Sequence, residues 1–401
     1  MVSVVFPPPG QTAEQGAKAL LEAARKNARA RGNHLVASSY LERWAVGGKI
    51  RITETDADKS YCQAPDAAAK EKDFYSLKAD ELDPDVVPPA LIETILSRVE
   101  GSAKELVDLL IADGPLALDE FDALSFATFL GFQLTRGRAF RARLRDLANR
   151  SQLLFWEDIT DEGIAQRLRE NGQDADADVV AGIRQFLEEW KAGRYAVRLP
   201  PAAEVFMAAE AVHPMAMNLL ARPFRIYRSP MPLIACDEPV VPLLLPGRDP
   251  RSEPGIATAG AIVFPLDPHH LLAMFHPYLA LDELALWPEL LPSETDEINL
   301  ALAAHSDRWL FEQANRTRTR TLLVPRHAPV RVRTQVVASA ESDEGLHELI
   351  RSSTPNRWWA APRPPRPPVE RWWRGVHTFP GLHRLAYDVE AMPYALFNAL
   401  G

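Results

Sequence analysis

Apolar residues in the first half of the chain recur every three or four positions, the spacing that lines one face of a helix. The pattern predicts helices over residues 12–31, 89–111, 118–150, 161–171, 175–192 and 201–221, with a short one from Ser39. Between the short helix that begins at Ser39 and the helix at 89–111, a short strand is expected at 49–53 and a polar loop at 56–73. The first half is therefore predicted to be rich in helix.

Beyond Pro223 the apolar residues gather in short runs bounded by Pro, Asp and Gly, which is typical of strands. Strands are predicted at 224–227, 233–236, 261–266, 271–275, 321–324 and 330–337, with one more helix at 294–313. No repeat of fixed period is present. We predict an α+β fold, in which a helix-rich N-terminal half precedes a small mixed or antiparallel sheet with helices. The parts expected are 1–222, 223–345 and a C-terminal extension 346–401, or all of these in one compact domain.

The C-terminal extension is rich in Pro, Trp and Arg. The sequences Arg357-Trp358-Trp359 and Arg371-Trp372-Trp373 flank a proline run that ends at Pro368. Successive prolines favour an extended polyproline II segment and exclude helix or central strand. The extension is either a strap held on its own domain by buried tryptophans, or a surface for a protein partner in the segment 358–373.

Composition and net charge argue against several classes of protein. The 401 residues are 47% hydrophobic and 25% charged, which is ordinary for a globular chain, and the net charge is −9. This charge argues against a general nucleic-acid coat, although a local basic patch would still allow nucleic-acid binding. No apolar run approaches the roughly 20 residues that span a bilayer, and residues 1–10 do not resemble a signal peptide. We expect a cytoplasmic protein without membrane association.

Familiar catalytic signatures are missing from the sequence. It contains no phosphate loop, dinucleotide fingerprint or His-Glu-x-x-His motif, and no Gly-x-Ser-x-Gly elbow. Its two cysteines, Cys62 and Cys236, fit neither a disulfide scaffold nor a metal site. No cofactor can be named from the sequence, and no metal ligands are predicted.

Polar residues inside apolar runs are the candidates for a site. His34 precedes the short helix with Tyr40 and Trp44; it would serve either as a general acid or base, or as a structural histidine that bonds a backbone carbonyl. Asp237 follows the strand 233–236. Its carboxylate is expected either at the edge of the sheet or in a turn, bonded to its own backbone.

A second group lies near the end of the long predicted helix. Gln133 and Arg136 are three residues apart and project from one face, and Arg138 adds positive charge beside them. Such a group could bind an anion. The alternative is that the arginines complement the dipole at the C-terminal end of the helix.

These segments together resemble a bacterial family known as domain of unknown function 4238. The resemblance covers roughly residues 33–315 and rests first on His34, Tyr40, Leu41 and Trp44, although Ala37 stands where the family usually has proline. Gln133 and Arg136 resemble a polar pair in its central helix, and Asn299 also looks familial. A family motif similar to Ser-Asp-Asn-Pro is here Cys236-Asp237-Glu238-Pro239, without the hydroxyl and the amide. The resemblance implies relatives but supplies no activity.

Two functions remain open. The first is a non-catalytic protein of a bacterial accessory system that binds a ligand or partner and contains a buried polar network of His34, Arg136 and Asp237. In the second, a hydrolase of a phosphate-containing or nucleic-acid substrate, these three residues are catalytic. In both, Tyr40, Gln133, Arg138 and Asn299 are predicted to contact the ligand. Convergence in an open cleft would favour chemistry, and a sealed core would favour structure.

Overall fold

The computed structural model describes residues 12–27, 32–57, 59–77, 82–114, 117–156, 159–196, 198–245, 254–277, 288–325 and 368–373. Its helices are α1 Ala13–Lys26, α2 Ser38–Leu41, α3 Leu91–Asp113, α4 Glu120–Thr135, α5 Arg138–Trp156, α6 Asp161–Glu170, α7 Ala177–Lys191, α8 Pro201–Glu210, α9 Val212–Leu220 and α10 Pro292–His305. Turns of 3₁₀ helix are η2 Glu42–Trp44, η3 Pro65–Ala67, η5 Arg318–Arg320 and η6 Glu370–Trp373. The predicted α+β class is confirmed.

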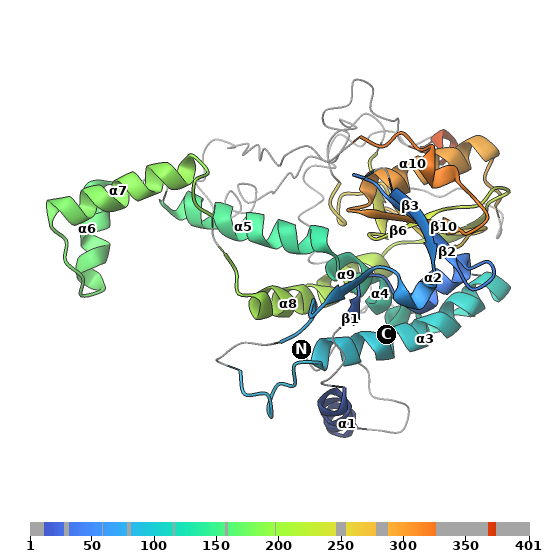
Figure 1. Ribbon diagram of the computed structural model, residues 1–401, viewed down its shortest axis with the longest axis horizontal. Coiled ribbons are helices and arrows are strands. Elements are labelled where there is room, and N and C mark those ends of the chain that lie inside the picture. Colours follow the sequence, from blue (N-terminus) through green and yellow to red (C-terminus); the bar gives the residue numbers. More distant parts are fainter. Residues whose placement is uncertain are drawn as a thin grey trace.

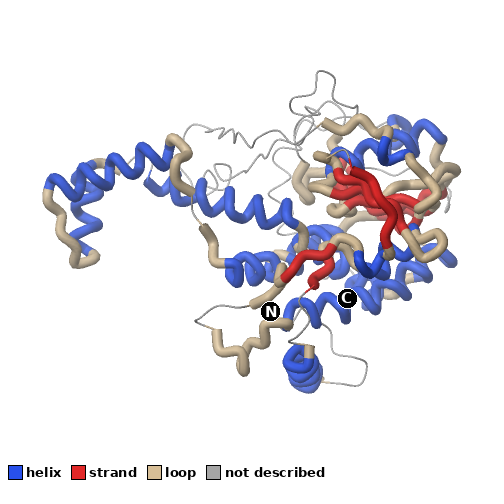
Figure 2. The backbone as a smooth tube through the Cα atoms, in the orientation of Figure 1, coloured by secondary structure: helices blue, strands red, loops and turns tan. Residues whose placement is uncertain are grey.

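The strands are β1 Gly32–His34, β2 Ile50–Glu54, β3 Lys59–Gln63, β4 Lys70–Lys72, β5 Phe224–Arg228, β6 Ala235–Cys236, β7 Val241–Leu243, β8 Ala261–Asp267, β9 His270–Phe275 and β10 Trp309–Gln313. They form three antiparallel sheets, ordered β1-β4, β3-β2-β10-β6 and β5-β9-β8-β7. Because β2 pairs with β10, one sheet joins the first part of the chain to its second part. Figure 2 shows the two four-stranded sheets gathered at one end of the molecule, with the short β1-β4 pair set apart from them.

One apolar core lies between the sheets and the helices. It extends from Leu20 in α1 to Phe311 in β10, and its largest sealed side chains include Trp44 and Phe264. Tyr40 stacks on Phe264, with 5.0 Å between the ring centroids. In Figure 1, α5 leads away from this body to the α6–α7 pair, which has a small core of its own. Among the described residues, no helix combines the length and apolar character needed to cross a bilayer.

Several predicted boundaries were wrong, and each error has a local cause. The helix expected over 118–150 divides at Arg136–Gly137 into α4 and α5, and the helix expected over 201–221 divides at Ala211. The polar stretch 56–73 contains β3 and β4, because antiparallel partners satisfy its backbone. The helix expected over 294–313 ends at His305, since residues 309–313 pair with both β2 and β6.

Near the C-terminus, residues 321–324 follow η5 and are not a strand. The strand predicted at 330–337, the proline run up to Pro367 and the first Arg-Trp-Trp sequence lie outside the described residues. Of the second sequence, Trp372 and Trp373 are both buried. This placement is the one expected of a strap.

Candidate functional site

Arg136 lies where α4 ends and is almost completely buried. Its Nη1 atom is 2.5 Å from Glu100 Oε1, and its Nη2 donates to the backbone carbonyl of His34 at 2.5 Å. Its Nε donates to the Tyr75 hydroxyl at 3.3 Å. Burial alone would lower the pKa of Arg136, but Tyr75 and Glu100 raise it above its ordinary value. The guanidinium therefore stays charged and links α3, α4 and the N-terminal segment.

The backbone carbonyl of His34 accepts the hydrogen bond from Arg136, but its imidazole ring bonds a different residue. The ring Nε2 lies 2.8 Å from the carbonyl oxygen of Asp66, which can only accept, so Nε2 carries the proton. Burial lowers the pKa of His34. A neutral ring that donates to a carbonyl is the structural role predicted as one alternative.

Asp237 holds the loop between α10 and β10. Its carboxylate accepts backbone N–H bonds from Asp307 at 2.9 Å, Arg308 at 2.7 Å and Trp309 at 3.1 Å. Burial, followed by Asp307, raises the pKa of Asp237 to about 7, while the three N–H donors oppose the shift. Asp237 follows the edge strand β6, as one alternative expected, but its carboxylate bonds a loop some 70 positions away in sequence and not its own backbone.

Glu238 is a buried acid that the sequence reasoning overlooked. Its side chain lies against Gly137, and Ala139 N in the first turn of α5 donates to Glu238 Oε1 at 3.3 Å. A helix N-terminus favours a negative charge at this place. Burial and then Asp237 nevertheless raise the pKa of Glu238 well above its usual range. The signals in the sequence were an acidic pair after a strand and a glycine inside a predicted helix.

Most of the other residues predicted to contact a ligand instead bond groups of the protein itself. The Tyr40 hydroxyl donates to Pro265 O at 2.9 Å, and the Asn299 side chain bonds Ile234 N and Pro232 O. Arg138 forms an ion pair with Glu71 and lies over the Trp309 ring.

Gln133 differs from these residues. It is 2% exposed, and neither of its side-chain polar atoms has a hydrogen-bond partner among the described residues. His34 and Arg136 belong to one hydrogen-bonded network and Asp237 to another, and the two meet at Arg136–Ala139, where Glu238 accepts the Ala139 N–H. The structure brings His34 and Arg136 into direct contact, and Asp237 reaches this junction through its neighbour Glu238.

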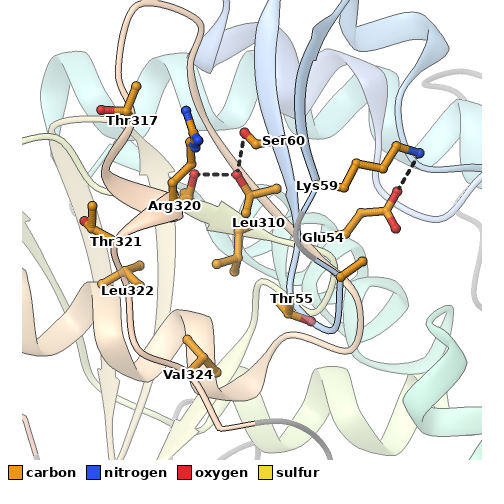
Figure 3. A pocket seen from close by; sticks show the side chains of 13 residues that line it. Glu54, Thr55, Lys59, Ser60, Leu310, Thr317, Arg320, Thr321, Leu322 and Val324 are labelled. Carbon is orange, nitrogen blue, oxygen red and sulfur yellow. Dashed lines mark hydrogen bonds and ion pairs between the residues drawn. The ribbon is translucent and has the colours of Figure 1, made fainter.

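An open cleft lies elsewhere, between the β2–β3 hairpin and the η5 loop (Figure 3). Its volume is about 390 Å³, within the range of small-molecule pockets. It is lined by the hydroxyl residues Thr53, Thr55, Ser60, Thr317, Thr319 and Thr321, together with Glu54, Ala57, Lys59, Leu310, Arg320, Leu322 and Val324. The sequence did not predict this cleft, because its lining comes from separate predicted elements: a strand and a loop for residues 53–60, a helix for Leu310 and a wrongly predicted strand for residues 321–324.

A line of hydroxyls runs through the wall of the cleft to a buried carboxylate. Ser60 Oγ lies 3.0 Å from Thr53 Oγ1, which lies 2.8 Å from Thr319 Oγ1. The Thr319 hydroxyl and backbone N–H both donate to Glu312, at 2.5 and 3.1 Å. Glu312 also accepts the N–H of Arg318. These bonds fix the η5 loop against β2 and β10, so the cleft is preformed.

The two basic residues of the cleft differ in their pairing. Lys59 Nζ is 3.3 Å from Glu54 Oε1, so its charge is partly balanced. The Arg320 side chain is exposed and has no hydrogen-bond or ion-pair partner within the described ranges. A guanidinium has five donors in a fixed fork, which suits a phosphate or carboxylate. This cleft therefore offers one open cation beside several hydroxyls, of which those of Thr55, Thr319 and Thr321 already donate to Arg308 O, Glu312 and Arg318 O.

Replacing Glu238 by glutamine should change the pH dependence of stability. Because the pKa of Glu238 is raised on folding, the stability supplied by its proton is fully present below about pH 4 and is lost as the pH rises. Gln keeps the shape and has no proton to lose. Relative to wild type, Glu238→Gln should gain on the order of 1 kcal/mol in unfolding free energy between pH 5 and pH 8.

Urea denaturation at the two pH values measures this gain. Exposed Glu105 provides the control, since Glu105→Gln should show no comparable change. An equal offset of Glu238→Gln from wild type at both pH values would contradict the assignment.

Comparisons with known proteins identify the family. The sequence profile of a family described as protein of unknown function (DUF4238) matches residues 33–316, so the chain belongs to that family. Neither the curated proteins nor the solved structures include a match. Within the described residues, no group of three or more His, Cys, Asp or Glu side chains could hold a metal ion.

Proposed function

We propose that this DUF4238 protein is a non-catalytic binding protein that takes a small phosphate-bearing ligand in the cleft between the β2–β3 hairpin and η5. The observation that carries the proposal is the juxtaposition of Arg320 with the hydroxyls of Ser and Thr residues in an open cleft of about 390 Å³. Phosphate oxygens accept several hydrogen bonds at once, and charge-assisted bonds to a guanidinium are the strong ones.

The buried networks support a binding role over the hydrolase alternative. A general acid or base must lie within hydrogen-bond reach of its substrate. The Nε2 of His34, the guanidinium of Arg136 and both carboxylate oxygens of Asp237 instead bond groups of the protein itself. Breaking the bonds of Arg136 or Asp237 to admit a substrate would leave buried polar groups unpaired, at about 1–3 kcal/mol each. In this proposal the networks hold the fold together, and the ligand binds elsewhere.

Calorimetric titration of the full chain with ribose 5-phosphate, ribose and inorganic phosphate tests the proposal. We expect ribose 5-phosphate to bind and ribose to bind at least tenfold more weakly. Arg320→Ala should weaken binding of ribose 5-phosphate by about tenfold or more, because a hydrogen bond to a charged group contributes about 1.5–3 kcal/mol.

Arg316 is the matched control, since it is exposed on the same loop and does not line the cleft. Arg316→Ala should bind as wild type does. Equal binding of ribose and its phosphate, or equal losses in the two arginine variants, would refute the proposal. Release of inorganic phosphate from ribose 5-phosphate by the purified protein would support a hydrolase instead.

A further inference from the structure

The segment Pro368–Trp373 packs on apolar side chains of the β5-β9-β8-β7 sheet, beside α10, and we call this surface the groove. The Trp372 ring lies 5.0 Å from the Tyr227 ring and 5.3 Å from the Phe275 ring, measured between centroids. Leu245 and Trp373 both cover Gly260, where an added Cβ would lie 2.7 Å from Leu245 Cδ2 and 3.0 Å from Trp373 Cζ3. A glycine at this position leaves room for both Leu245 and the indole.

Acidic side chains of α10 form the rim of the groove. Glu297 Oε2 accepts the Val369 N–H at 2.8 Å, and Glu294 Oε1 lies 2.6 Å from Arg371 Nε. Val369 itself is fully buried. The groove thus selects a basic residue next to two indoles, through complementary charge as well as apolar contact.

Two hydrogen bonds lie within the segment itself. Trp373 Nε1 donates to Pro368 O at 2.9 Å, and Trp372 N donates to Val369 O at 2.9 Å. It contacts the sheet without pairing as a strand. In addition, neither the Tyr227 hydroxyl nor Trp372 Nε1 forms a hydrogen bond of normal geometry within the described residues, although both are buried. Because the segment is not paired as a strand, it can leave or enter the groove without breaking a β ladder.

The chain that connects the segment to the rest of the protein is long enough for the segment to bind a groove other than that of its own copy. Residues 326–367 separate it from the preceding described residues, and a chain of this length can span more than about 100 Å. The segment also lies beyond residues 33–316, which match the family. The groove belongs to the family domain, and its occupant belongs to an extension.

We propose that this groove is a recognition site for the Pro-Val-Glu-Arg-Trp-Trp segment of a second copy of the chain, so that two copies exchange their C-terminal segments. Exchange of an identical element preserves every contact made within one copy. The interaction is independent of the phosphate cleft and would persist if that proposal failed.

Two full-length charge variants test the exchange. Glu294→Arg places Arg against Arg371, and Arg371→Glu places Glu against Glu294, so neither variant alone should hold its segment. Mixed together, each chain offers the groove that fits the other's segment. Light scattering should show a single-chain mass for each variant and a two-chain mass for the mixture. A mixture that stays at the single-chain mass would overturn the proposal.

Since Glu294 also caps the N-terminus of α10, a second measurement guards against misfolding of its variant. Full-length Trp372→Ala/Trp373→Ala should bind a labelled Pro368–Trp373 peptide, followed by fluorescence anisotropy. Adding Gly260→Leu, which fills the space shared by Leu245 and the Trp373 ring, should weaken this binding at least tenfold. Absence of peptide binding, or binding that Gly260→Leu leaves unchanged, would also overturn the proposal.

Discussion

Replacing Arg136 by alanine is expected to lower the free energy of unfolding by about 3–5 kcal/mol, because it breaks a buried ion pair and leaves its partners unpaired. Glu100, Tyr75 and the His34 carbonyl would each lose a donor. Arg136→Lys should be nearly as damaging, since an ammonium cannot reproduce the planar fork that contacts all three. Urea denaturation, with far-ultraviolet circular dichroism as the signal, gives the change.

Arg138 is the matched control for this experiment. It lies two residues away and is also paired with a glutamate, but its side chain is 35% exposed. Exposed pairs contribute about 0–1 kcal/mol, so Arg138→Ala should unfold at nearly the wild-type urea concentration. If the two variants lost similar stability, Arg136 would not be the link between α3, α4 and the N-terminal segment.

The second large effect is expected at Gly137. An added Cβ would lie 1.9 Å from Glu238 Oε1 and 2.5 Å from Glu238 Cδ, and the buried carboxylate has no solvent to move into. We expect Gly137→Ala to cost about 2–3 kcal/mol, as overpacking of a filled core does. Thermal or urea unfolding of the full chain measures the loss.

A double-mutant cycle identifies the cause. Glu238→Ala removes the obstructing carboxylate, so adding Gly137→Ala to that variant should cost less than about 1 kcal/mol. Gly101→Ala is the control, because Gly101 lies in α3 with nothing within 4 Å of the added methyl. That change should stabilise the helix by about 0.5–1 kcal/mol. A cost at Gly137 that persists without the Glu238 side chain would show that the backbone, and not the carboxylate, demands glycine.

At the candidate site, the residue pattern predicted which side chains need partners but not which atoms form the bonds. The sequence singled out His34, Arg136 and Asp237 because polar groups in apolar runs need partners, and all three do bond groups of the protein, although the Asp66 carbonyl that His34 bonds is exposed. It could not say which atoms would be used. Arg136 reaches the carbonyl of His34 instead of its ring, and Asp237 bonds three N–H groups next to β10. Such choices depend on contacts between segments far apart in the chain, and local spacing carries no information about them.

What the sequence determined by itself is the α+β class, the family and the position of most helices, since helical periodicity and capping act within a few residues. Tertiary structure alone decided the break between α4 and α5, the pairing of β2 with β10 and the formation of the cleft. At the break between α4 and α5, Glu238, about 100 positions later, accepts the Ala139 N–H and fills the space beside Gly137. The cleft joins Thr53 to Thr319 across 266 positions. Non-local packing assembles these features, so they exist only in the folded chain.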